Sequence, residues 1–224
     1  MTLPALTSER LRLVPVRDEH RDLLVELNSD PEVMRLIRGR PATPEETREE
    51  WDRRLGHQTD EDRGLGYWVG FAGDRFVGWW SASSFASDPT MSGVGYRLRR
   101  EAWGRGLATE GGRVMVEQAF AAPCVEKVVA SAMSVNAASR AVLAKLGMTH
   151  VDTIRGGRDH RIPGWEQGDV VYEVTRKYRT TGVRPRNSDV TVPTGPTARR
   201  TDTRATHHMG WASSSIAGEA YFGW

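Results

Sequence analysis

Two glycines one residue apart, Gly104 and Gly106, separate a strand-like run from a helix-like segment. Backbone N–H groups at such a turn into a helix converge on one point, and this geometry binds anions. A dinucleotide fingerprint requires a third glycine where Thr109 stands, and a P-loop requires a Lys-Ser/Thr pair directly after Gly106. Residues 100–120 therefore predict a strand, an anion-binding loop of neither of those two classes, and a helix, and the rest of the chain must pack around them.

Hydrophobic periodicity and turn residues predict the other elements. Alternation of apolar residues predicts strands, whereas apolar residues at helical spacing behind capping residues predict helices. The predicted strands are residues 10–16, 66–71, 75–84, 91–99, 125–133, 149–155 and 169–176, and the predicted helices are residues 18–28, 31–37, 43–55, 107–121 and a segment after Asn136. Gly73-Asp74 predicts a hairpin, and the apolar run 125–133 predicts a buried, parallel strand. The mixture is typical of an α/β (α+β) fold, with the polar helix 43–55 on its surface.

Composition favours one main domain. The chain has 224 residues, of which 38% are apolar, enough for one good core. Residues 179–224 are rich in Thr, Arg, Pro and Ser, which predicts a disordered or loosely docked tail after a domain of residues 1–178. From Arg176 onward basic residues outnumber acidic ones by five, whereas the remainder is mildly acidic.

Two further features bound the class of protein. No apolar run approaches the roughly 20 residues that span a bilayer, and the first residues lack the apolar region of a signal peptide. We therefore expect a cytoplasmic protein without a membrane partner. The single cysteine, Cys124, excludes an intrachain disulfide framework, and we expect it to be a small buried or half-buried apolar residue.

Two motifs together resemble one known family. A-W-G-R-G-L-A-T-E, at residues 102–110, resembles the acetyl-CoA pyrophosphate loop of the GNAT N-acetyltransferase superfamily, especially its RimJ/RimL-type branch. N-A-A-S-R-A-V-L-A-K-L-G-M, at residues 136–148, resembles the second signature of that family. The resemblance covers residues 6–177. It implies a mixed, mostly antiparallel seven-stranded sheet, flanked by four to five helices and splayed at its middle, where acetyl-CoA binds as co-substrate.

The resemblance also implies roles for individual residues. Amides of the loop should hold the pyrophosphate, the backbone N–H of Leu98 should contact the thioester carbonyl, and Asn136 and Ser139 should reach the pantetheine arm or the sulfur. Asn136 could equally be a helix cap alone. The implied cofactor-binding set is Leu98, Arg99, Gly104, Arg105, Gly106, Leu107, Ala108, Thr109, Asn136 and Ser139. Leu98 and Ser139 are also the implied catalytic residues.

Two family residues that move protons are missing. Many relatives have a tyrosine on the helix after Asn136 that protonates the departing thiolate. Leu143 stands in that region here, which leaves Ser139 as the well-placed hydroxyl. The glutamate that often precedes Gly-Tyr on the fourth strand is replaced by Gly93. An ammonium must lose a proton before it attacks a thioester, which requires a base or a water chain. The remaining candidates are His150, Asp152, His160, Glu166 and Glu173, each of which could instead be a solvated surface group.

Four further aromatic residues are candidates for the acceptor side. Trp79 and Trp80 are adjacent in a strand and must point to opposite faces. One of these two tryptophans could line the acceptor pocket, as could Tyr67 or Trp165. The alternative for each is packing in the core. His207-His208 lacks any further ligand pattern, so we expect no metal site.

The sequence therefore predicts an acetyl-CoA-dependent N-acetyltransferase. The amine, a protein N-terminus or a small molecule, would attack the thioester directly in a ternary complex without a covalent enzyme intermediate. The alternative is an acyl-CoA-binding module with little turnover, whose basic tail binds an acidic partner. Nucleic-acid binding by the tail is a weaker hypothesis, because its arginines are not interleaved with aromatic residues. A homodimer is possible.

Overall fold

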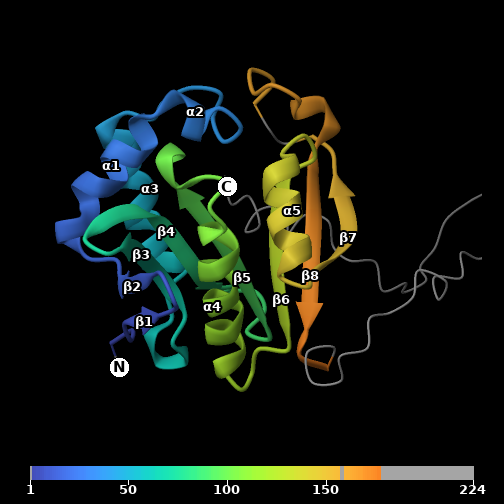
Figure 1. The fold of residues 1–224 in the computed structure, drawn as a ribbon. Helices are drawn as coiled ribbons and strands as arrows, with labels where there is room; N and C mark the ends of the chain where they lie inside the picture. Colours follow the sequence, from blue (N-terminus) through green and yellow to red (C-terminus); the bar gives the residue numbers. More distant parts are fainter. Residues whose placement is uncertain (1, 157–158, 178–224) are drawn as a thin grey trace, which may run out of the picture.

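A single mixed sheet organises the chain. The computed structural model describes residues 2–156 and 159–177. The tail predicted at residues 179–224, with His207-His208, lies outside these described residues. The strands lie in the order β1-β2-β3-β4-β5-β6-β8-β7 (Figure 1). They are β1 (Leu6–Thr7), β2 (Arg12–Pro15), β3 (Gly66–Ala72), β4 (Arg75–Ser84), β5 (Met91–Leu98), β6 (Lys127–Met133), β7 (Thr149–Ile154) and β8 (Asp169–Thr175).

Five α-helices are described, and their boundaries follow capping chemistry. They are α1 (Arg21–Ser29), α2 (Pro31–Met34), α3 (Pro44–His57), α4 (Leu107–Ala121) and α5 (Ala137–Lys145). The side chain of Asp30 accepts hydrogen bonds from the first amides of α2, as expected of a helix cap. Thr43 and Glu46 form a reciprocal capping box at the start of α3. Gly106 precedes α4 in a left-handed conformation, and Asn136 caps α5.

Helices cover both faces of the sheet. One core, between the sheet and α4 with α5, includes Trp80, Met115 and Leu143. The other, between the sheet and the first three helices, includes Trp51 and Trp79. Trp79 and Trp80 thus point to opposite faces, as predicted, and both are fully buried. In Figure 1, α1, α2 and α3 lie beside the N-terminal half of the sheet, and α5 lies in front of β6 and β8.

The pairing of β5 with β6 divides the sheet. These strands are parallel, as predicted, but pair only from Met91 with Lys127 to Gly93 with Val129. Beyond that point they diverge, and Figure 1 shows the two strands separating toward the ends at which α4 and α5 begin. All the other strand pairs are antiparallel. The splayed, mostly antiparallel sheet agrees with the predicted fold class.

Three details differ from the predictions. The described sheet has eight strands and not seven, because the two-residue β1 pairs with β2. The prediction of α3 as a surface helix is wrong for one of its faces, because that face buries Trp51 and Arg54. The prediction for Cys124 is also wrong, since the residue is exposed in the turn after α4, with its Sγ 3.8 Å from Nη1 of Arg63. No described helix is long and apolar enough to cross a membrane.

Candidate functional site

The gap between β5 and β6 exposes a row of backbone groups. The N–H of Arg99 donates to the carbonyl of Val77 at 2.9 Å, and β4 and β5 are antiparallel. Hydrogen bonding alternates along such a pair. The N–H and C=O of Tyr96 and of Leu98 therefore point away from β4, toward the gap that β6 has left. The carbonyl of Leu98 already accepts from the indole of Trp103. An extended chain carrying amides could supply partners to the N–H of Leu98 and to the backbone groups of Tyr96.

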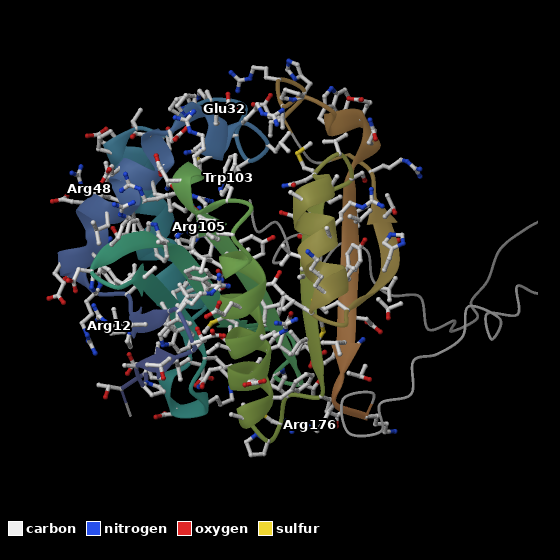
Figure 2. All side chains as sticks on the ribbon, viewed as in Figure 1. Arg12, Glu32, Arg48, Trp103, Arg105 and Arg176 are labelled. Atoms are coloured by element: carbon white, nitrogen blue, oxygen red, sulfur yellow. The ribbon has the colours of Figure 1, made fainter. Side chains whose placement is uncertain are left out.

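The glycine loop lies at the end of β5. Gly104 and Gly106 have φ of 69° and 80°, the left-handed region that favours glycine. The indole Nε1 of Trp103 donates to the carbonyl of Leu98 at 2.9 Å and ties the loop to the strand. A Cβ built on Gly104 would meet nothing within 4 Å, so the loop is open. Figure 2 labels Trp103 and Arg105 on this loop, beside the start of α4.

Helix α4 contributes its N-terminus to the same place. Its first intrahelical bond runs from the N–H of Glu110 to the carbonyl of Gly106 at 3.0 Å, so the preceding amides are available to an anion. The helix lies close to the sheet, because a Cβ on Gly111 would come within 2.5 Å of the Trp80 indole. Of the predicted loop residues, Leu107 and Thr109 have buried side chains and can offer only their backbone.

A pair of hydroxyl groups bridges from β5 to α5. The hydroxyl of Tyr96 donates to Oγ of Ser139 at 3.3 Å. The side chain of Asn136 accepts from the N–H of Ser139 at 3.1 Å, so Asn136 does cap the helix. Burial raises the pKa of Tyr96, although its hydrogen bond to Ser139 opposes the rise. Tyr96 therefore stays a neutral donor, and it holds Ser139 beside the gap.

The opposite face of β5 carries a buried ionic cluster. Arg97 points toward the first three helices, and its Nη1 donates to Oδ1 of Asn28 at 2.6 Å. Glu50 lies 3.4 Å from Arg97 and 2.9 Å from Arg54. Both guanidinium groups also lie over the ring of Trp79, at 5.3 and 5.5 Å. Burial opposes ionisation of Glu50, but Arg97 and Arg54 together lower its pKa, so it stays a carboxylate.

Other predicted positions have structural explanations. Arg99 makes a 2.7 Å ion pair with Glu26 of α1, so its guanidinium is directed away from the glycine loop. The same guanidinium lies 3.6 Å from the exposed carboxylate of Glu101. Gly93 is buried, and its carbonyl accepts from Ser83. Leu143 lies in the core with Met115, which explains an apolar residue there.

None of the five candidate bases is buried. His150 is exposed and packs at a tilt against the ring of Tyr172, and Asp152 accepts from the amide of Thr153. Glu173 pairs with Lys127 at 3.3 Å. The remaining two, His160 and Glu166, are also exposed. The structure therefore gives none of these side chains the desolvated setting that raises the basicity of a catalytic carboxylate.

The predicted aromatic pocket residues separate into two kinds. Tyr67 is fully buried against Trp51 and Trp79, and its hydroxyl donates to Oε1 of Gln58. It therefore belongs to the core. Trp165 is 37% exposed on the loop between β7 and β8. That loop reaches the segment after α2, because a Cβ on Gly39 would lie 3.1 Å from the carbonyl of Arg161.

The predicted donor-site residues thus meet at one place. The open glycine loop fits a diphosphate, and the backbone row of β5 fits the amides of a pantetheine arm. Leu98, Gly104 to Ala108, Asn136 and Ser139 surround this gap, whereas the side chain of Arg99 does not. Sequence reasoning missed Tyr96, although its alternation with Leu98 places both side chains on one face of β5.

Comparison with known proteins agrees with this geometry. Residues 10–149 match the family described as Acetyltransferase (GNAT) domain. The chain is 40% identical over 184 residues to FsC-acetyl coenzyme A-N(2)-transacetylase of Aspergillus fumigatus, covering 78% of this chain and 77% of that protein.

Two solved structures share the fold. RimL, an alpha-N-protein acetyltransferase in complex with coenzyme A, aligns with a TM-score of 0.63 at 18% identity, over 78% of this chain and 98% of its own. A spermidine N-acetyltransferase of Vibrio cholerae in complex with CoA and spermine aligns with a TM-score of 0.62 at 13% identity, over 76% of this chain and 98% of its own.

Proposed function

Since the chain belongs to the GNAT acetyltransferase family and uses acetyl-CoA as its co-substrate, we propose that it transfers the acetyl group to the N(2) amine of FsC or a close analogue. The relative whose name specifies this acceptor is 40% identical over 184 residues. The solved protein N-terminal and spermidine acetyltransferases are 18% and 13% identical, which supports the fold alone. The shared motifs are those of the RimJ/RimL-type branch, and we assign the chain to that branch.

The donor half of the proposal is carried by one observation, the part of β5 beside the glycine loop that does not pair with β6. We assign the diphosphate to the amides from Gly104 to Ala108, and the pantetheine amides to the gap side of Tyr96 and Leu98. The N–H of Leu98 polarises the thioester carbonyl and stabilises the oxyanion that forms there. Each of these contacts uses backbone groups, so the side chains at these positions are free to pack in the core.

Proton transfer is divided between the two reacting atoms. The amine attacks the carbonyl carbon, the carbon–sulfur bond breaks, and the sulfur leaves with the electron pair. Ser139 donates a proton to this thiolate, and Tyr96 holds the serine hydroxyl in place. The proton that the attacking nitrogen loses as the amide forms passes to solvent, and solvent returns a proton to Ser139. A thiol has a pKa of about 8.5, so this help is modest. Glu50 is held ionised between two guanidinium groups, which makes it a poor base.

The amine therefore reacts as its unprotonated fraction. An amine with a pKa of about 8 to 10 is partly unprotonated near neutral pH. Since none of the candidate bases in the described part of the chain is desolvated, kcat/KM for the acceptor should rise with pH and level off when the pH reaches the pKa of the amine.

An acceptor panel tests the proposal. The purified full chain is mixed with acetyl-CoA and FsC, spermidine, an aminoglycoside or a short peptide with a free N-terminus, and thiol release is followed. We expect the highest kcat/KM with FsC and a product acetylated at N(2). A higher kcat/KM with the peptide or with spermidine would overturn the acceptor assignment. CoA binding without thiol release on any amine would overturn the enzymatic proposal.

A further inference from the structure

Glu110 in the first turn of α4 is bound by the start of the chain. Its Oε1 accepts from Oγ of Ser8 and from the backbone N–H of Arg10, both at 2.7 Å. Its Oε2 accepts from Nε of Arg10 at 2.7 Å and lies 2.5 Å from Nη2. Four contacts thus join α4 to the β1–β2 connection, about a hundred residues away in the sequence.

The same arginine also holds the loop itself. Nη1 of Arg10 donates to the carbonyl of Arg105 at 2.9 Å, between the two left-handed glycines. In a trans peptide the C=O and the following N–H point in opposite directions. Because the carbonyl of Arg105 faces Arg10, the N–H of Gly106 points away from the guanidinium. That orientation leaves this amide for a bound anion, as an anion-binding nest requires.

Arg10 also offsets an unfavourable charge. Glu110 stands at the helix end where the diphosphate of acetyl-CoA would lie, and two negative charges there repel each other. Burial opposes ionisation of Glu110, but Ser8 and Arg10 together lower its pKa, so the carboxylate persists at neutral pH. The Arg10 guanidinium is half-exposed and lies between this carboxylate and the loop.

We propose that Arg10 is a positioning residue of the donor site, which fixes the glycine loop in its anion-binding conformation and neutralises Glu110. This inference rests on the proposed use of acetyl-CoA in the gap between β5 and β6. It assigns a purpose to the Glu of the A-T-E motif, which anchors the guanidinium. It also assigns a role in donor binding to the first hairpin, which lies outside both sequence motifs.

Three variants test it. Arg10→Gln removes the charge and the bond to Arg105, whereas Arg10→Lys keeps a charge for Glu110 but cannot hold both partners with one ammonium. Arg12→Gln is the matched control, because Arg12 lies on β2 and its guanidinium stacks 4.9 Å from the centre of the Phe71 ring. Figure 2 labels Arg12 on the hairpin and Arg105 on the loop.

Calorimetric titration gives the first readout. We expect Arg10→Gln to weaken binding of CoA roughly tenfold, since loss of preorganisation lowers affinity. The affinity for dephospho-CoA should fall by the same factor, because this ligand keeps the diphosphate. Arg10→Lys should fall between wild type and Arg10→Gln, and Arg12→Gln should match wild type.

A truncated donor separates positioning from a general structural effect. S-acetylpantetheine has no diphosphate, so its kcat/KM should be unchanged in Arg10→Gln, whereas acetyl-CoA should show a raised KM with a similar kcat. Any of three results in Arg10→Gln would overturn the inference. They are an unchanged affinity for CoA, a loss of affinity for CoA without one for dephospho-CoA, and an equal loss of kcat/KM with S-acetylpantetheine. Failure of the wild-type chain to bind CoA would instead overturn the proposed function.

Discussion

The buried cluster around Glu50 makes a quantitative prediction about stability. Glu50→Gln keeps the shape of the side chain but removes the charge that lies 2.9 Å from Arg54 and 3.4 Å from Arg97. The two guanidinium groups, both stacked on Trp79, then repel each other in a buried setting. Removing one member of a buried ionic group typically costs about 3–5 kcal/mol, because the remaining charge is left uncompensated. With a urea m-value of about 2 kcal/mol/M, the midpoint should fall by about 2 M.

Urea unfolding followed by tryptophan fluorescence measures this change. Glu49→Gln, one residue earlier on the exposed side of α3, is the matched control. We expect the free energy of unfolding of the control to change by less than about 0.5 kcal/mol, as is usual for surface positions. Equal shifts for the two variants would refute the argument that Glu50 compensates the arginines.

The pH dependence gives the same argument a second test. The folded pKa of Glu50 is lowered by Arg97 and Arg54 against the opposing effect of burial. A carboxyl with a lowered folded pKa stabilises the protein fully above its unfolded pKa and loses that contribution as the pH falls through the folded value. The difference between wild type and Glu50→Gln should therefore be constant near neutral pH and shrink in acid. A difference that grows in acid would contradict the sign.

Two further predictions concern the donor site. Gly106→Val forces a β-branched residue into a φ of 80°, so CoA affinity should fall at least about tenfold while thermal unfolding stays cooperative. Normal CoA affinity in calorimetric titration would defeat the loop assignment. Ser139→Ala should lower kcat near pH 7 by roughly tenfold, and the defect should shrink as the pH passes the thiol pKa of about 8.5, where the departing thiolate needs no proton; a pH-independent defect in a thiol-release assay would remove Ser139 from proton donation.

Local patterns predicted most of the fold. The strand at residues 75–84 and the helix at residues 107–121 have the predicted bounds in the structure. Their signals are strong, because a glycine turn or a capping geometry fixes each end. The two-residue β1 has no periodicity to detect, and it is held by pairing with β2 and by packing of Leu6 on the core.

The residues that sequence reasoning missed act over long distances. Arg10 and Glu110 are a hundred residues apart, and Glu50 and Arg97 are 47 apart. No local pattern distinguishes such a pair from solvated charges. The polar composition of α3 suggested a surface helix for the same reason, since the partners of its buried face come from β3, β4 and β5. The prediction that Cys124 is buried or half-buried rested on the average burial of cysteine. The residue is exposed because it lies in the turn after α4.

Alternation along β5 connects the two halves of the site. Tyr96 and Leu98 present their backbone groups to the gap and their side chains to the α4 face, whereas Arg97 between them enters the ionic cluster with Glu50. The side chain that fixes the strand from one face thus lies between the two residues that we assign to the donor. A shift of β5 by one residue would exchange these faces and bury an arginine against α4. The buried cluster therefore specifies the register on which the position of the Leu98 amide depends.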